Sequence, residues 1–271
     1  MSEAVFVNKA YKQFGGLSGT LLKRMPSFSR GFARHAGSTK TGLSQMEPVV
    51  AVNRVSFDVQ EGEIFGLVGP KGSGKSTLLS MMGALNTPTS GQYSVDGLEV
   101  YELGQDQRAD FRREFLGFVF QSFHLVSYLT LLENVMLPLV TVKTDGRTKR
   151  SMAEDALSRV GLDRTAHRLP SQVSGGDQAR VAIARAIVNE PPILLADEPS
   201  GNLDSKTTRE VMDLFRSLNQ DGMTIVMVTH SPECAGYARR LLRISDGLLV
   251  EDILLNGAEE NLACRSIGLT A

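Results

Sequence analysis

The sequence has no tryptophan, only two cysteines and few aromatic residues, which make up 6% of its 271 residues. Cys234 and Cys264 lie far apart and lack the short spacing of metal-binding cysteines. The two cysteines therefore indicate ordinary thiols of a reducing compartment, and their spacing argues against a cysteine metal site. Hydrophobic residues form 42% of the chain, which is enough for a substantial core.

Long hydrophobic runs are also missing. A membrane-spanning helix needs about 18 consecutive apolar residues, whereas the longest apolar stretches here, such as 64–68 and 193–196, have the length of single strands. The first residues lack the hydrophobic core of a signal peptide, and a net charge of −1 gives no global attraction for nucleic acid. We therefore expect a cytosolic protein without a nucleic-acid partner, which reaches a membrane only through another chain.

Acidic residues are absent from 4–46, although lysine and arginine recur there. Glycine and serine are frequent at about 17–46, which favours a basic, loop-like insertion that is flexible and solvated. Apolar residues at near-helical spacing leave a second interpretation open, in which this insertion contacts anionic lipid or a membrane partner. An organelle-targeting segment is the third interpretation.

The order of the predicted elements indicates an α/β fold in a single domain, 1–271. Apolar strands are predicted at 49–59, 64–68, 193–196 and 224–228, and helices at 75–85 and 181–188. Apolar strands that alternate with helices are typical of a mainly parallel sheet covered on both faces. The span of about 114–170 has a mostly helical pattern, so we expect it to form a lobe inserted into the sheet domain.

A glycine-rich loop follows the strand predicted at 64–68. It fits the pattern G-x-x-x-x-G-K-[ST] and consists of Gly69, Pro70, Lys71, Gly72, Ser73, Gly74, Lys75 and Ser76. Glycines let successive main-chain N–H groups converge on a phosphate, and the following helix presents its positive end to the same anion. We expect Lys75 to reach the β- and γ-phosphates of ATP, Ser76 to bind Mg²⁺, and the next residue, Thr77, to line the same site.

Two carboxylates follow the strand predicted at 193–196. Asp197 and Glu198 would lie beyond the carboxyl end of a parallel strand, where the ligands of such sheets bind. We expect Asp197 to hold Mg²⁺ and Glu198 to orient and deprotonate the attacking water. His230 follows the strand at 224–228 on the same rim, and it is predicted to contact the γ-phosphate and the water.

One segment resembles the signature of ABC ATPases, and it consists of Ser174, Gly175, Gly176 and Asp177. Other positions are similar to that family in the same order: Gln121 in its glutamine loop, the acidic pair soon after the signature, Asp204 in the segment that faces a second subunit, and His230 as its switch histidine. The resemblance covers nearly the whole chain outside 17–46. It implies a P-loop NTPase fold of the RecA type, with a mainly parallel sheet core, a β subdomain and an inserted α-helical lobe.

The resemblance also implies how such a protein works. Two copies would join head to tail around two ATP molecules, and one copy would contact the ATP of the other through Ser174, Gly175, Gly176, Asp177 and Asp204. The catalytic groups would be Glu198, His230, Gln121 and Lys75, and Mg²⁺ would be held by Ser76, Gln121 and Asp197. Gln121 and the residues after it would pass the resulting motion to an integral membrane permease.

Within the family, residues 121–125, 129–135 and 196–204 are similar to the group that serves lipoprotein release, macrolide export and cell division. This similarity implies that ATP hydrolysis energises export or extraction of a lipoprotein, drug, peptide or lipid-like substrate at the cytoplasmic face of the inner membrane. A periplasmic adaptor could complete the complex. Two alternatives stay open: a soluble ABC-type ATPase of DNA repair, chromosome organisation or translation, and a mechanotransmission ATPase of cell division.

Two residues depart from the family pattern. Asp177 stands where glutamine is usual, and Lys71 stands where a small or amide residue is usual. Because head-to-tail copies would bring the two loops together, one hypothesis is that these charges compensate each other across the interface, and tolerated drift at both positions is the other. The family's adenine-stacking aromatic residue is matched best by Phe14, with Tyr11 as the alternative.

Overall fold

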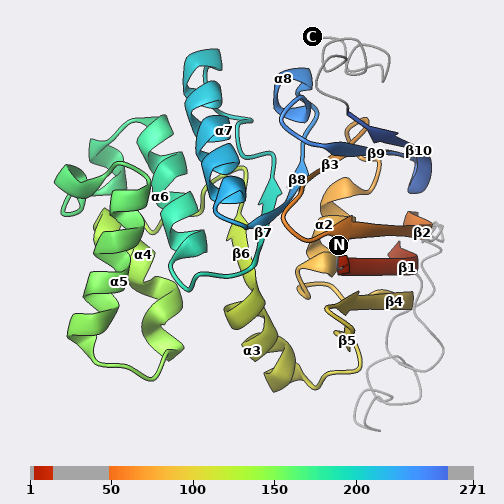
Figure 1. The fold of residues 1–271 in the computed structure, drawn as a ribbon, viewed down its shortest axis with the longest axis horizontal. Coiled ribbons are helices and arrows are strands. Elements are labelled where there is room, and N and C mark those ends of the chain that lie inside the picture. Colours follow the sequence, from red (N-terminus) through yellow and green to blue (C-terminus); the bar gives the residue numbers. More distant parts are fainter. Residues whose placement is uncertain (1–2, 15–48, 256–271) are drawn as a thin grey trace, which may run out of the picture.

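The computed structural model describes residues 3–14 and 49–255, so the insertion predicted at 17–46 lies outside the described residues. Two β-sheets enclose one helix between them, and further helices cover the opposite face of the larger sheet (Figure 1). This arrangement confirms the predicted α/β fold.

The smaller sheet is antiparallel, with the strand order β2-β1-β4-β5. Its strands are β1 (Glu3–Phe14), β2 (Val49–Gln60), β4 (Ser90–Val95) and β5 (Leu98–Glu99). Along β2, Val55, Phe57 and Val59 are buried while the residues between them are more exposed. That alternation places one face of the strand on the core, and the sheet corresponds to the predicted β subdomain.

The larger sheet has the strand order β10-β9-β3-β8-β7-β6. Its strands are β3 (Ile64–Val68), β6 (Leu116–Val119), β7 (Ile193–Asp197), β8 (Thr224–Val228), β9 (Arg240–Ser245) and β10 (Leu248–Leu254). All neighbours are parallel except β10, which runs antiparallel to β9. Every residue of β3 and β8 is buried, as expected of central strands with helices on both faces.

The helices are α2 (Lys75–Met82), α3 (Gln105–Phe115), α4 (Leu131–Met136), α5 (Gly146–Arg159), α6 (Gly175–Ile187), α7 (Ser205–Gln220) and α8 (Pro232–Ala235). Short 3-10 turns occupy Leu137–Thr141, Asp163–Thr165 and Pro170–Gln172. Several helices begin where a side-chain oxygen accepts main-chain N–H groups of the first turn, as Asp145, Ser174 and Asp204 do.

The hydrophobic core lies in two layers on either side of the larger sheet. One layer joins the antiparallel sheet to α2, and in it Phe57 of β2 stacks on Phe65 of β3 with ring centroids 5.3 Å apart. The other layer contains α4, α5, α6 and α7. Figure 1 shows α4 and α5 at the end of the molecule opposite to the antiparallel sheet.

Strands β2 and β7 are each one residue longer than expected, and three other elements differ more from the ranges expected above. Helix α2 ends at Met82 because the main chain turns at Gly83, and α6 begins earlier than expected, at Gly175. Within the span of 114–170, residues Leu116–Val119 form strand β6 of the larger sheet, and the helices of this span begin at Leu131. The prediction of a mostly helical span did not single out β6, because this strand is short and follows α3 without a turn.

Candidate active site

The predicted site residues sit on loops that leave four neighbouring strands. The glycine loop follows β3, His230 follows β8, Asp197 and Glu198 stand at the end of β7, and Gln121 follows β6. These strands are adjacent and parallel in the order β3-β8-β7-β6. All four loops therefore emerge at one edge of the sheet, where ligands of open parallel sheets bind.

Two glycines of the loop are required by close packing against its surroundings. A Cβ atom on Gly69 would lie 2.0 Å from the carbonyl oxygen of Ile244, and one on Gly74 would lie 2.1 Å from the carbonyl oxygen of Ala51. Both residues also have positive φ angles, +144° and +102°. Glycine is the residue that tolerates both constraints. The main-chain carbonyl groups of Ile244 and Ala51 pack against the loop, and no sequence pattern could have predicted these two neighbours.

Lys75 begins α2 and folds back into the loop. Its ammonium group donates to the carbonyl oxygens of Gly69 and Pro70, both at 2.8 Å, and to Ser73 Oγ at 3.3 Å. The side chain is buried, and this burial lowers the pKa of Lys75 despite the opposing charges of Glu198 and Asp197. The loop thus holds a desolvated cation in its concave side, where an anion would gain most from it.

Ser76 and Asp197 meet across the edge of the sheet. Ser76 Oγ donates to Asp197 Oδ1 at 3.1 Å, although the two residues come from different βα connections. Burial raises the pKa of Asp197, while the hydrogen bond from Ser76 and the charge of Lys75 act in the opposite direction. A hydroxyl and a carboxylate at this separation form a set of hard oxygen donors that suits Mg²⁺.

Glu198 and His230 form the second close pair. His230 Nδ1 lies 2.9 Å from Glu198 Oε1, with the histidine side chain 63% exposed and the glutamate 21%. Glu198 has a φ of +47°, which is strained for a residue with a side chain, and its N–H donates to the carbonyl oxygen of Val228 at 2.9 Å. The neighbouring strand therefore holds the glutamate in an unfavourable conformation that aims it beside the histidine.

Gln121 contacts a loop that follows β7. Asn202 Nδ2 donates to the carbonyl oxygen of Gln121 at 3.1 Å, and a Cβ atom on Gly201 would lie 2.9 Å from Gln121 Nε2. Among the described residues, no hydrogen bond links Gln121 to Ser76 or Asp197, so its predicted place at Mg²⁺ stays a prediction. Sequence reasoning found the glutamine but did not find Asn202 as its neighbour.

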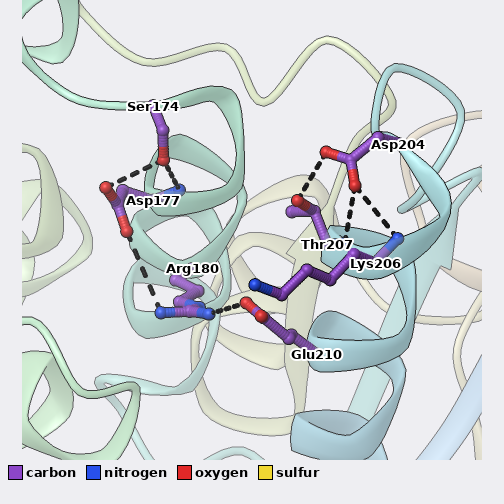
Figure 2. A network of polar contacts seen from close by, with 7 residues as sticks. All are labelled: Ser174, Asp177, Arg180, Asp204, Lys206, Thr207 and Glu210. Atoms are coloured by element: carbon purple, nitrogen blue, oxygen red, sulfur yellow. Dashed lines mark hydrogen bonds and ion pairs between the residues drawn. The ribbon is translucent and has the colours of Figure 1, made fainter.

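The predicted signature segment forms the start of α6 (Figure 2). Ser174 Oγ accepts from the Asp177 main-chain N–H at 3.1 Å and donates to Asp177 Oδ2 at 2.9 Å. Asp177 also lies 3.9 Å from Arg180, which pairs with Glu210 on α7. The negative charge of Asp177 is therefore partly compensated within its own chain, by Ser174 and Arg180, and the sequence did not predict these contacts.

The starts of α6 and α7 are packed directly against each other (Figure 2). Asp204 caps α7 by accepting from the N–H groups of Lys206 and Thr207 and from Thr207 Oγ1 at 2.6 Å. These hydrogen bonds lower the pKa of Asp204, and those from Thr207 contribute most. A Cβ atom on Gly176 would lie 2.5 Å from Thr207 Cγ2, so this glycine permits the close approach of the two helices.

Other predicted residues lie apart from these pairs. Pro70, Lys71 and Gly72 form the exposed tip of the glycine loop, Gly175 is exposed at the start of α6, and Thr77 belongs to α2. Among the described residues, none of the hydrogen bonds or ion pairs joins the signature segment to the glycine loop. Phe14 ends β1, where it pairs with Val49, and the position of its side chain lies outside the described residues.

A groove of about 550 Å³ opens beside Gln121, whose chain neighbour Phe120 lines it, and its other walls come from α3, β6, the 3-10 turn Leu137–Thr141 and the end of α6. Its walls are mainly apolar and include Leu85, Leu116, Phe118, Phe120 and Leu137, with Arg112, Arg113 and Arg185 at its sides. Leu85 and Leu137 are 53% and 38% exposed.

No helix within the described residues is long and apolar enough to cross a membrane.

The family model described as "ABC transporter" matches residues 52–201. An uncharacterized ABC transporter ATP-binding protein of Methanocaldococcus jannaschii is 45% identical over 204 residues, which are 75% of this chain and 91% of the relative. The macrolide export ATP-binding/permease protein MacB of Burkholderia pseudomallei is 48% identical over 207 residues, 76% of this chain. The chain spans only 32% of the length of that MacB relative.

A solved structure of an ATP-binding cassette gives the same result at the level of the fold. This cassette is a dimer in a post-hydrolysis state, bound to ADP and Pi. It is 36% identical in sequence and has a TM-score of 0.76, and the match covers 93% of this chain and 99% of the cassette.

Proposed function

The chain belongs to the ABC transporter family of ATP-binding proteins, and we propose that it hydrolyses ATP at the edge of its larger sheet to energise a transporter. One observation carries the proposal. Two pairs from three separate segments converge there, Ser76 with Asp197 at 3.1 Å and Glu198 with His230 at 2.9 Å. A phosphate loop, an Mg²⁺ ligand, a general base and a γ-phosphate contact are the parts that phosphoryl transfer to water requires.

Each part would have a distinct role. The glycine loop and Lys75 would hold the phosphates, and Ser76 and Asp197, with Gln121, would hold Mg²⁺, which supplies charge neutralisation at the phosphate oxygens. Glu198 would take the proton of the attacking water, and His230 would hold that water and the γ-phosphate in line. The close contact between His230 and Glu198 supports this division, because it orients the carboxylate that acts as the base.

The direct test is an ATPase assay of the purified protein with Mg²⁺. We expect Glu198→Gln to lower the rate at least a hundredfold and to retain ATP binding, because the amide keeps the shape of the side chain but cannot accept the proton. Glu154→Gln, at an exposed glutamate of α5, is the matched control. Equal rates for Glu198→Gln and the wild type would refute the assignment of the base.

The complete site would need a second copy of the chain. The signature residues Ser174, Gly175, Gly176 and Asp177, together with Asp204, would contact the ATP bound by the other copy. Two observations support this arrangement: Ser174 and Gly175 are exposed, and the related cassette that is 36% identical was solved as a dimer bound to ADP and Pi. A head-to-tail orientation would let the signature of each copy reach the phosphate loop of the other, because the two segments lie on different elements of one chain.

A membrane permease would be the other partner. The MacB relative carries the word permease in its name and is about three times as long as the region matched here, whereas the M. jannaschii relative is covered almost completely by this chain. This chain would therefore serve a separate membrane subunit from the cytoplasmic face of the membrane. The likeness to MacB supports export or extraction of a drug, lipoprotein, peptide or lipid-like substrate.

The groove beside Gln121 would receive a short cytoplasmic helix of that permease. An amphipathic helix could bury its apolar face against Leu85 and Leu137, and acidic residues on its sides would meet Arg112 and Arg113. We expect the Glu198→Gln variant to retain a multi-spanning membrane protein from detergent-solubilised membranes with ATP present.

The same pull-down with Leu85→Asp or Leu137→Asp should lose that protein, whereas Leu98→Asp, at a leucine of similar exposure on β5, should keep it. Retention of only soluble or nucleic-acid-bound proteins by Glu198→Gln would refute the transport role and leave the ATPase role untouched.

A further inference from the structure

Arg185, in the last turn of α6, binds main-chain carbonyl groups and no carboxylate. Its Nη1 donates to the carbonyl oxygen of His124 at 2.7 Å, and its Nη2 donates to that of Phe123 at 2.5 Å. Within the described residues it takes part in none of the ion pairs. Burial lowers the pKa of Arg185, but a guanidinium stays charged throughout the physiological pH range. Burying half of a cation that is satisfied only by two carbonyl groups costs free energy. We therefore asked what the two bonds do for the segment that supplies those carbonyl groups.

The segment that Arg185 holds has an unfavourable main-chain conformation. Phe123 and His124 both have positive φ angles, +57° and +48°, although neither is glycine. In this region the Cβ atom crowds the following carbonyl group, so two such residues in succession persist only when their surroundings impose them. The buried side chain of Phe123 anchors one side of the turn, and Arg185 anchors its carbonyls on the other.

This turn determines where Gln121 lies. The Phe123 N–H donates to the carbonyl oxygen of Phe120 at 2.9 Å, which closes a turn with Gln121 and Ser122 as its two central residues. Asn202 holds the carbonyl oxygen of Gln121 from the other side. Any relaxation of Phe123 and His124 would open the turn and displace Gln121 from the edge of the sheet.

Helix α6 connects this turn to the signature segment. Ser174 caps the start of the helix and Arg185 lies 11 residues further on, which is about 16 Å along the helix axis. A contact of Ser174 with ATP would therefore be transmitted by a stiff helix to the carbonyls of the Gln121 turn. Sequence reasoning noted this arginine only as part of a helix, because its partners lie about 60 residues earlier in the chain.

We propose that Arg185 is a positioning residue, which fastens the Gln121 turn to the signature helix and so keeps Gln121 in place for ATP hydrolysis. The proposal rests on the ATPase function proposed above. It predicts that the effect of losing Arg185 depends on how strained the turn is. Glycine at position 124 would remove the steric cost of the positive φ, so the turn would no longer depend on the guanidinium.

The test is a double-mutant cycle of ATPase kinetics with Arg185→Ala and His124→Gly, which also corrects for the ring contact between His124 and Phe120. In the wild-type background we expect Arg185→Ala to lower kcat about tenfold, to change the KM for ATP less than twofold, and to raise the Mg²⁺ concentration needed for half-maximal rate. In the His124→Gly background the loss of kcat should shrink to threefold or less. Arg150→Ala, at an exposed arginine of α5, is the control.

Two outcomes would overturn the proposal: an equal loss of kcat in both backgrounds, or no loss from Arg185→Ala. If Arg185→Ala fails to fold, Arg185→Lys takes its place in the cycle, because one ammonium can satisfy one carbonyl and should give a smaller loss with the same dependence on His124→Gly. Glu198→Gln in the same assay tests the ATPase assignment by itself. If Glu198→Gln is inactive and Arg185→Ala has no effect, only the positioning role of Arg185 is rejected.

Discussion

Among single residues, Asp177 stands out because its carboxylate would lie near the γ-phosphate of the ATP bound by a second copy. Its carboxylate accepts the Ser174 hydroxyl proton at 2.9 Å and lies 3.9 Å from Arg180. The hydroxyl that would bind the γ-phosphate is thus already engaged within its own chain. Lys71, in contrast, is exposed and makes no hydrogen bond or ion pair with the other described residues, so its charge is available to a second copy.

Charge-swap variants distinguish compensation from tolerated drift at these two positions. We expect Lys71→Glu and Asp177→Lys each to slow ATP hydrolysis, and the double swap to be several-fold faster than the slower single variant, because the attraction across the interface is restored. The measurement is the ATPase rate at low salt, repeated at high salt, where screening should reduce the differences. A double swap no faster than the slower single variant would mean that the two charges do not meet.

Glu63, the residue immediately before β3, gives a pH prediction. It is 8% exposed and accepts from the Gln60 N–H at 2.7 Å, and burial raises its pKa. The folded protein then binds this proton more tightly than the unfolded chain, so the stability contributed by the group falls as pH rises from its unfolded pKa of about 4.3 through its folded value.

Glu63→Gln keeps the carbonyl acceptor without the charge. We expect a higher Tm than the wild type at about pH 7 and a smaller difference near pH 5, measured by calorimetry, with the exposed Glu190→Gln as the control. A lower Tm for Glu63→Gln at pH 7 would show that the attraction to Arg240 outweighs the cost of burial.

At the level of elements, the close contact of α6 with β6 sets the position of the signature helix. A Cβ atom on Gly117 of β6 would lie 2.5 Å from the carbonyl oxygen of Ala186, which is main chain and cannot rotate away. The helix could approach the sheet this closely only where a strand residue lacks a side chain. The same helix carries Ser174 and Arg185, so its position affects both ends of the coupling proposed above.

Gly117→Ala should therefore destabilise the protein by about 1–3 kcal/mol through overpacking. Gly146→Ala is the matched control, because nothing lies within 4 Å of a Cβ there and the residue begins α5. Urea unfolding at equilibrium gives both values. A Gly117→Ala variant as stable as the control would show that α6 can shift without cost.

At the scale of the whole molecule, the exposed signature and the exposed tip of the glycine loop are surfaces that a second copy would cover. We expect Glu198→Gln with Mg²⁺ and ATP to elute at twice the monomer mass in gel filtration with light scattering, and as a monomer with ADP. Hydrolysis would remove the γ-phosphate contacts that hold the two copies together. Adding Ser174→Arg should prevent the dimer, and a dimer that persists with that change would place the interface elsewhere.

Local chemistry was readable from the sequence because each motif is a run of adjacent residues. The spacing of Gly69, Gly74 and Lys75 indicates a phosphate loop, the apolar strand before Asp197 places its carboxylate at a strand end, and the order of strands and helices indicates the parallel sheet. Contacts between distant segments depended on how the strands were ordered, and no spacing encodes that order. The resemblance to a known family already implied that Ser76 and Asp197 share one Mg²⁺. The tertiary structure alone decided that Ile244 supports Gly69 and that Arg185 holds a turn about 60 residues away.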